Sequence, residues 1–339
     1  MKTSKEYFLK MRTTKKDLIP DFDSILNVFN DKYPLSRKEF NHLYNKRIFG
    51  NSLLLRPFLS KLIYELGAMA DWKIHSRLFA LVEVINISTY QSNLAFDNKN
   101  GIRSELDKFN QIISAFFSTF IFFDEIIVSQ YDDRKRLNII EATVKGLEEI
   151  YYGQYIDLNI LSFSNESLYQ SFEFFEDQYK LRCQHLGSSL INLCINYCVI
   201  LNDSKIDEIK DELIRFGTLF GLAGQILNDL GDISSKGRVY STNRYSDIEN
   251  ERLTLPVFFL MQIGHDKRPA KNHLIDLCKN DKVIVELIDK IKFYIAPYIF
   301  EINNLMEIIK TKGFNIEELL FLSKLLEKSN YLKIKNHVY

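Results

Sequence analysis

The stretch from Gly217 to Pro256 reads GTLFGLAGQILNDLGDISSKGRVYSTNRYSDIENERLTLP, and the interpretation of the whole chain depends on it. At its centre, the spacing places Asn228 and Asp232 on one helical face, a turn apart, with Asp229 beside them. Oxygens that converge in this way suit Mg²⁺, with room left for water and phosphate oxygens. Four cations that could bind a diphosphate follow: Lys236, Arg238, Arg244 and Arg252. The stretch therefore predicts metal-assisted chemistry on a diphosphate.

The neighbouring residues bear on a simpler interpretation, in which the acidic residues form a solvated helix face. Gly217, Gly221 and Gly224 lie at helical spacing, and a glycine inside a helix costs about 1 kcal/mol relative to alanine. Glycines in such positions indicate the close approach of another helix or of a ligand. Apolar residues surround the polar cluster, and a buried carboxylate needs a partner. This context favours an ion beside the carboxylates.

The same residues resemble the second aspartate-rich region of the polyprenyl synthetase family, the trans-isoprenyl diphosphate synthases. The family pattern is G-x-x-x-G-x-x-F-Q-I-x-D-D-x-x-D, followed downstream by D-L-x-x-G-K-x-T-L-P. This chain aligns with it without a gap, and Asn228, Asp229 and Asp232 take the three acidic positions. The later part is matched by Asp247, Arg252 and Thr254-Leu255-Pro256. The resemblance implies an all-α fold, a single-domain helical bundle of the isoprenoid synthase type with a central apolar cavity.

Other family landmarks occur at compatible spacing, so that the resemblance covers roughly residues 45–260. Leu55-Arg56-Pro57 resembles the end of the GGKxxRP motif, and Arg103 matches the second Arg of a later RRG motif. The segment Asn93-Leu-Ala-Phe-Asp97 stands at the place of the first aspartate-rich motif. Arg182 stands where a lysine is usual.

The departures from the family pattern concentrate on one side of the implied site. The first motif should read DDxxD, but here Asp97 is its only carboxylate and Asn93 offers a weak oxygen ligand. The family's residues for isopentenyl diphosphate are largely replaced, by Leu53, Ile102, Gly224 and Asn86. Each charge-assisted hydrogen bond contributes about 1.5–3 kcal/mol. The side of the second motif is therefore kept better than the isopentenyl side.

The resemblance also implies a set of site residues and a cofactor. Mg²⁺ is expected to be held by Asn228, Asp229 and Asp232, with Asp97 and Asn93 on the opposite side. Asp229, Asp232 and Asp97 are then the catalytic carboxylates, because the metal stabilises the charge on the departing diphosphate. The residues expected to bind the diphosphate are Arg56, Arg103, Arg182, Gln225, Arg244 and Arg252.

The acceptor of the prenyl cation separates three functional hypotheses. The losses on the isopentenyl side favour terpene cyclisation, or transfer to a non-standard acceptor. Ordinary chain elongation is the alternative that Arg56 and Arg103 support. A catalytically weakened subunit that regulates an active synthase is the third hypothesis, and the NLAFD sequence supports it. The expected partners are accordingly a prenyl diphosphate substrate and a second copy of the chain, or an active synthase.

Composition limits the remaining possibilities. No Gly/Pro/Ser-rich linker divides the 339 residues, so we expect one domain, with residues 1–35 and 330–339 peripheral. A net charge of zero gives no electrostatic case for nucleic-acid binding. The N-terminus lacks a secretory signal, and the most apolar run, Ile112 to Phe123, is too short to span a bilayer. With four cysteines that need no disulfide, we expect the protein in the cytoplasm.

Apolar periodicity predicts helices throughout the chain. We expect them at roughly 37–48, 53–67, 74–95, 105–130, 133–153, 167–200, 205–231, 252–264, 282–309 and 316–328. Asp23 or Ser24 is expected to begin an early helix. Two aromatic groups, around Phe116–Phe123 and Phe172–Phe175, are either ordinary core or the wall of a cavity for a prenyl tail.

Overall fold

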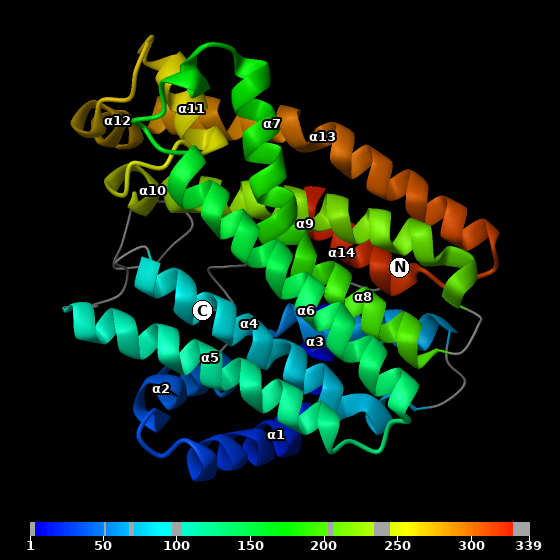
Figure 1. Cartoon of the computed structure of the whole chain (residues 1–339). Coiled ribbons are helices and arrows are strands. Elements are labelled where there is room, and N and C mark those ends of the chain that lie inside the picture. The colour runs from blue at the N-terminus through cyan, green and yellow to red at the C-terminus, as the bar shows by residue number, and fades with distance from the viewer. Residues whose placement is uncertain are drawn as a thin grey trace.

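The computed structural model describes residues 4–50, 52–67, 71–96, 104–202, 206–233 and 245–327. Within these ranges the chain is helical, and its one extended pairing is an isolated bridge between Ser162 and Arg252. The predicted all-α fold is therefore confirmed. Figure 1 shows the helices stacked at varied angles around a packed interior.

The helices in chain order are α1 (Ser4–Lys32), α2 (Arg37–Ile48), α3 (Leu55–Gly67), α4 (Ser76–Phe96), α5 (Glu105–Ile127), α6 (Asp133–Tyr155), α7 (Phe172–Cys183), α8 (Ser189–Leu201), α9 (Lys210–Ile233), α10 (Ser246–Glu249), α11 (Leu255–Ile263), α12 (Lys271–Cys278), α13 (Asp281–Thr311) and α14 (Glu317–Glu327). Short 3₁₀ turns occur at Trp72–His75, Glu166–Tyr169 and Ile206–Ile209, and π-helical turns at Ile156–Ile160 and Gln184–Ser188.

Helix α9 carries the decisive sequence and lies in the interior of the fold. It packs against α8, α11 and α13, and against the π-helical turn that follows α7 (Figure 1). Two of its glycines make this packing possible. A Cβ atom at Gly217 would lie 2.3 Å from Asn192 Oδ1, and one at Gly221 would lie 2.4 Å from Ser188 Cα. The expected close approach of a helix is thus found at these two positions.

The third glycine of α9 has different surroundings. Among the described residues, no other atom lies within 4 Å of the place that a Cβ atom at Gly224 would take. Gly224 and Gln225 are half-buried and Asn228 is exposed, and the three positions share one side of α9. This open side of α9, defined by Gly224, Gln225 and Asn228, is where a ligand can reach the helix.

The N-terminal segment is not peripheral, in contrast to the expectation for residues 1–35. Helix α1 runs without a break through Asp23 and Ser24, so neither residue begins a helix. Its side chains Leu18, Phe22 and Ile25 are fully buried against the other helices of the core. The apolar period of this segment therefore describes a core helix, and residues 330–339 lie outside the described part of the chain.

The expected helix over 167–200 is helical without a break from Phe172 to Leu201, but it contains a π-helical turn. It consists of α7, the π-helical turn Gln184–Ser188 and α8. At this turn the backbone meets α9, because a Cβ atom at Gly187 would lie 2.3 Å from the carbonyl oxygen of Gly221. Helix periodicity alone cannot predict this insertion, since the contact comes from a distant part of the chain.

Helix α5 combines a buried polar edge with an exposed apolar face. Its polar edge packs on α4, where Ser88 Oγ donates to the Ala115 carbonyl at 2.8 Å and Gln91 Nε2 donates to Ser114 Oγ at 3.0 Å. By length and composition α5 is the one helix in the described ranges that could cross a membrane, and 33% of its most apolar window is buried.

Candidate functional site

The two carboxylates of the α9 motif face the protein interior. Asp229 is 3% exposed and Asp232 is 7% exposed, whereas the neighbouring Asn228 is exposed to solvent. Since each residue turns a helix by about 100°, adjacent positions in the motif face different surroundings. Asn228 is therefore the member of the motif that lies on the open side of α9.

Asp229 belongs to a buried acid–arginine cluster, which consists of Asp157, Tyr179, Arg182, Gln225 and Asp229. Asp229 Oδ2 accepts hydrogen bonds from Tyr179 Oη at 2.7 Å and Arg182 Nη1 at 2.5 Å. Its Oδ1 accepts a bond from Gln225 Nε2 at 2.8 Å. Arg182 also donates from Nε to Asp157 Oδ1 at 2.7 Å. The cluster thus joins α7, α9 and the turn Ile156–Ile160.

Burial controls the ionisation of this cluster. Burial raises the pKa of the Asp229 carboxyl, and the charge of Arg182 opposes that rise. Burial also raises the pKa of Tyr179 well above its usual value, with the Asp229 charge adding to the effect. For Arg182, burial acts to lower the pKa, but Asp157 and Asp229 outweigh it and raise the pKa. Tyr179 and Arg182 are therefore protonated donors at every physiological pH.

Asp232 fixes the segment that follows α9. Its Oδ1 accepts a hydrogen bond from Ser246 Oγ at 2.8 Å, and its Oδ2 accepts one from the Asp247 amide at 2.9 Å. Next, the Arg252 amide donates to the Asp247 carbonyl at 2.7 Å. Asp232 consequently positions the short helix α10 and, through it, the backbone of Arg252.

Arg252 lies next to the acid–arginine cluster. Its Nη1 donates to the Leu158 carbonyl at 3.0 Å, and its Nε lies 3.8 Å from Asp157 Oδ2. The guanidinium is mostly buried, as is that of Arg182. Both arginines thus contact the protein's own carboxylate. Their expected role as diphosphate ligands stays a prediction.

The donors that the structure describes do not fit a Mg²⁺ ion held by Asp229 and Asp232. All four carboxylate oxygens accept hydrogen bonds from the protein, as the contacts above show. Among the described residues, no three His, Cys, Asp or Glu side chains gather in a geometry for a metal ion. Asn228 and the half-buried Asn93 offer amide oxygens, which are weaker ligands than carboxylates. The arrangement differs from the prediction, in which the carboxylates face a metal.

Several predicted site residues lie outside the described part of the chain. Asp97, Arg103 and Arg244 belong to this group, as do Lys236 and Arg238. Asn93 is carried near the end of α4, and Arg56 is half-buried in the first turn of α3. Leu53, which replaces the family's lysine, is buried in the hydrophobic core.

A further buried acid, Glu83, pairs with a cation that was not predicted. Glu83 of α4 is fully buried, pairs with Arg47 of α2, and accepts a hydrogen bond from Asn86 Nδ2 at 2.8 Å. Lys15 of α1 donates to the Gly50 carbonyl at 2.5 Å and the Ser52 carbonyl at 2.8 Å. Burial lowers the pKa of Lys15. These contacts link α2 with α4, and α1 with the segment after α2. The residues are far apart in the chain, so no local motif predicts the contacts.

The aromatic groups are only partly available for a prenyl tail. Phe116 and Phe120 lie on the exposed face of α5. Phe122 and Phe175 are fully buried, and Phe175 stacks on Phe258 with ring centroids 4.5 Å apart. Ordinary core packing therefore accounts for the buried members.

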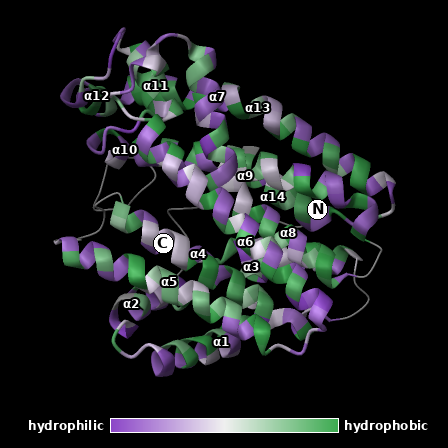
Figure 2. Cartoon of the chain, viewed as in Figure 1, coloured by the Kyte–Doolittle hydropathy of each residue, from purple (hydrophilic) through white to green (hydrophobic). Residues whose placement is uncertain are grey.

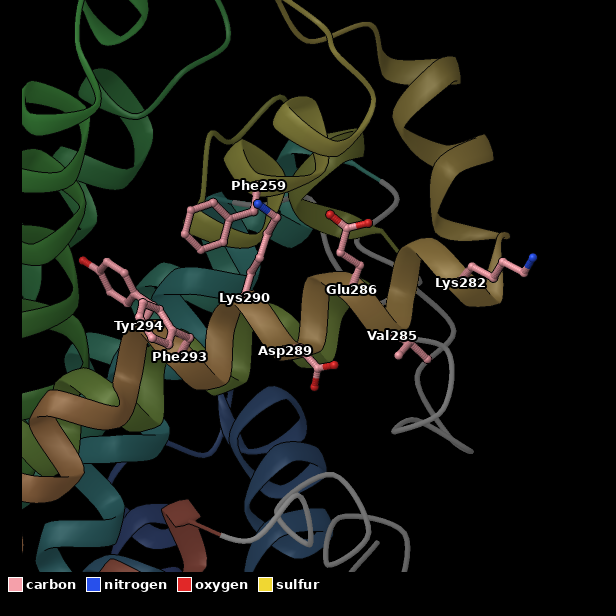
Figure 3. Close-up of a pocket in the computed structure, with 8 residues that line it drawn as sticks. All are labelled: Phe259, Lys282, Val285, Glu286, Asp289, Lys290, Phe293 and Tyr294. Atoms are coloured by element: carbon pink, nitrogen blue, oxygen red, sulfur yellow. The ribbon is translucent and has the colours of Figure 1, made fainter.

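A groove formed by described residues lies between α11 and α13. It has a volume of about 800 Å³, and Figure 3 shows Phe259 of α11 beside Lys290 and Tyr294 of α13. Its lining contains no residue of α9. The groove is thus separate from the open side of α9, and the predicted central cavity stays a prediction.

The helical fold is that of a class I isoprenoid synthase, as comparison with solved structures shows. Decaprenyl diphosphate synthase from Rhodobacter capsulatus has 15% identity and a TM-score of 0.67, covering 97% of this chain and 99% of that one. Heptaprenyl diphosphate synthase from Staphylococcus aureus has 16% identity and a TM-score of 0.71, covering 93% and 98%. At these identities the likeness concerns the fold.

The chain belongs to the polyprenyl synthetase family, which it matches over residues 101–292. It is also 24% identical over 258 residues to a prenyl transferase from Cyanidium caldarium, covering 74% of this chain and 75% of the relative. The protein is therefore an enzyme of the class I isoprenoid synthase kind. The relatives named here are prenyl transferases or prenyl diphosphate synthases, so the hypothesis of cyclisation or of a non-standard acceptor gains no support from them.

A further structural relative was solved with ligands. Polyprenyl synthase from Caulobacter crescentus CB15, complexed with calcium and isoprenyl diphosphate, has 15% identity and a TM-score of 0.66. The likeness covers 92% of this chain and 95% of that one.

Proposed function

We propose that the protein is a chain-elongating prenyltransferase, which joins an allylic prenyl diphosphate to isopentenyl diphosphate. The observation that carries this proposal is the continuous family match over residues 101–292, which includes all of α9 and its open side. The sequence analysis ranked cyclisation first because of the losses on the isopentenyl side. The relatives favour elongation instead, since those named above lengthen or transfer prenyl chains.

The proposed reaction has a simple balance. The allylic C–O bond breaks and its electron pair leaves with the diphosphate. The double bond of isopentenyl diphosphate then forms the new C–C bond, and a proton is lost, which the released diphosphate can accept. Hydrogen-bond donors aimed at the leaving group accelerate such a step electrostatically. We assign this role to Gln225 and Asn228, with Arg56, Arg103 and Arg244 as further candidates.

Mg²⁺ remains our predicted cofactor, although Asp229 and Asp232 do not suit it. When bound, such a metal would supply charge stabilisation for the diphosphate. Asp97 is the carboxylate whose position would decide this prediction, and it lies outside the described residues. Activity measured in EDTA instead of Mg²⁺ tests directly whether the reaction requires the metal.

Incubation of the purified protein with defined substrates tests the proposed reaction. Geranyl, farnesyl and geranylgeranyl diphosphates are each supplied with and without isopentenyl diphosphate, in Mg²⁺ or in EDTA. Released phosphate and extracted products are both measured. Elongation predicts a product one isoprene unit longer, which forms only when isopentenyl diphosphate is present. A cyclic hydrocarbon formed without it would overturn the proposal.

A catalytically weakened subunit is the second candidate function. The observation that favours it is the choice of residues, since Asn93 and Asn228 stand at positions where the family has carboxylates and Asp229 is buried. This candidate predicts no diphosphate release from any substrate by the pure protein. It also predicts that the rate or product length of an active synthase changes when the two are mixed.

We further propose that the protein forms a homodimer through α5. Its outer face carries large apolar side chains at spacings of three, four and seven residues, which place them in one stripe. Their exposed fractions lie between 43% and 68%: Leu106, Phe109, Ile113, Phe116, Phe120 and Ile127. Figure 2 shows apolar residues along much of this helix. A patch of this kind on a soluble chain marks an interaction surface.

We place the protein in the cytoplasm. Its four cysteines are all free thiols, and all of them are buried. Free thiols persist in a reducing compartment. The apolar face of α5 does not require a bilayer, because a second copy of the same face would cover it.

A further inference from the structure

We infer that Asp229 and Asp232 are structural residues that hold the substrate end of α9, and that α9 meets the diphosphate directly through the Asn228 amide. No metal ion would then be bound by the α9 carboxylates. The inference deepens the proposed function, since it concerns the same diphosphate. It can be tested without turnover, so the proposed reaction can fail while the inference stands.

Both oxygens of Asp229 are engaged by the protein. They accept hydrogen bonds from three donors on two helices, namely Tyr179, Arg182 and Gln225. A metal ion would have to share these oxygens with Arg182 or displace it, inside a site that is 3% exposed. Displacing Arg182 would also leave a buried cation short of a partner. Removing one partner of a buried ion pair strongly destabilises a fold.

The ion pairs around Asp229 are balanced in charge. They bring together Arg182, Arg252, Asp157 and Asp229, whose formal charges cancel. A Mg²⁺ ion bound to Asp229 would add two positive charges to this group, which has little access to water. Asp232 and Asp247 are also buried nearby, and Asp232 is engaged by the start of α10.

A further argument comes from Asp232. Its two oxygens accept bonds from Ser246 and from the Asp247 amide, as α10 begins. This contact fixes the chain that returns to Arg252. Asp232 therefore stabilises the conformation of the segment that follows α9, because its oxygens accept hydrogen bonds from a hydroxyl group and a backbone amide.

Asn228 completes the argument because an amide and a carboxylate treat a phosphate differently. A carboxylate repels a phosphate oxygen unless a cation lies between them. An amide N–H donates to the phosphate oxygen directly. Asn228 is the exposed member of the motif and lies beside Gln225 and the open space at Gly224. The exchange of Asp for Asn at this position thus suits direct contact with the anion.

Stability measurements test the structural role of Asp229. We compare Asp229→Asn, Arg182→Met and the double variant by denaturant unfolding. Each single change should raise the unfolding equilibrium constant at least tenfold, and the double change should cost less than the sum of the two. Tyr179→Phe is a milder variant that keeps the charges and should destabilise less. Additive single effects, or a fully stable Asp229→Asn, would contradict the inference.

Binding measurements test the role of the metal. Mn²⁺ binding is followed by electron paramagnetic resonance, and binding of inorganic diphosphate in EDTA is followed by calorimetry. Asp229→Asn should leave the Mn²⁺ affinity of the folded protein within about twofold of wild type, and a wild type without measurable Mn²⁺ binding supports the inference equally. Asn228→Asp and Asn228→Ala should weaken metal-free diphosphate binding at least fivefold. A tenfold loss of Mn²⁺ affinity in Asp229→Asn, or no diphosphate binding in EDTA, would overturn the inference.

Discussion

At the scale of single residues, the chemistry of α9 follows from the direction in which each side chain points. Asn228 and Asp229 are adjacent in the chain, but one is exposed and the other is enclosed by donors. The helix geometry imposes this difference, because one step along the chain rotates the side chain by about 100°. The sequence motif alone does not show this difference in exposure, although a buried carboxylate and an exposed amide have different chemical roles.

Gly224 provides a prediction at this scale. Gly224→Phe restores the aromatic residue of the family pattern, and the space around a Cβ atom there is open. We expect the variant to fold and to bind isopentenyl diphosphate more tightly, with a KM lowered severalfold, because the ring adds a packing surface. Steady-state kinetics with varied isopentenyl diphosphate measure this effect.

Gly221→Ala is the matched control for that change. A Cβ atom at Gly221 would lie 2.4 Å from a backbone atom of Ser188. The added methyl group should therefore lower the thermal unfolding temperature clearly, although it is much smaller than the ring at 224. If Gly224→Phe is the more destabilising of the two, the open side of α9 is assigned incorrectly.

At the scale of elements, apolar periodicity predicted most of the helices. The expected ends of α2, α5 and α6 agree with the structure to within about one helical turn. The π-helical turn inside the helix over 167–200 was not predicted, because the contact between Gly187 and Gly221 that accompanies it is a tertiary one. The local sequence predicts where helices form, but it does not predict which segments distant in the chain pack against them.

For the candidate site too, the local motif could be predicted from the sequence and the tertiary contacts could not. The motif on α9 could be located from the sequence, since its residues are close together in the chain. The partners of Asp229 could not, because Tyr179 and Arg182 lie 50 and 47 residues away. The pairing of Arg47 with Glu83 joins different helices in the same way. Only the packing of α7 on α9, and of α2 on α4, determines these partners.

The 3₁₀ turn before α4 contains a histidine that should make the stability of the protein depend on pH. Burial lowers the pKa of His75 to about 4, and its Nδ1 lies 3.0 Å from Tyr131 Oη. Because the pKa is lower in the folded state, the stabilising contribution is present above the unfolded value of about 6.5. It is lost as pH falls from there toward 4. Protonation of His75 should therefore destabilise the turn.

Denaturant midpoints measured between pH 7 and pH 4 test this expectation. The wild-type midpoint should fall across this window, and His75→Gln should fall less steeply, since glutamine does not titrate. The carboxylates contribute to both proteins equally, so the difference between the two curves isolates the histidine. Parallel curves would show that His75 is not the group responsible.

At the scale of the whole molecule, the polar groups of the site and the apolar stripe of α5 lie on different helices. The polar edge of α5 is occupied by α4, through Ser88 and Gln91. The stripe is therefore left as a separate surface, available to a second copy of the chain. A symmetric dimer buries the same patch on both subunits, and about 800 Å² per partner is usual for a stable interface.

Substitution of one aromatic residue in the stripe tests the dimer. Phe116→Glu should convert the protein to a monomer in light scattering at micromolar concentration, because it places a charge in the centre of the proposed apolar contact. Phe300→Glu on α13 is the matched control, since Phe300 is 68% exposed and lies outside the stripe. That variant should keep the wild-type mass. A wild type that is monomeric, or a dimer that both variants retain, would place the interface elsewhere, and a change in mass for Phe300→Glu alone would assign it to α13.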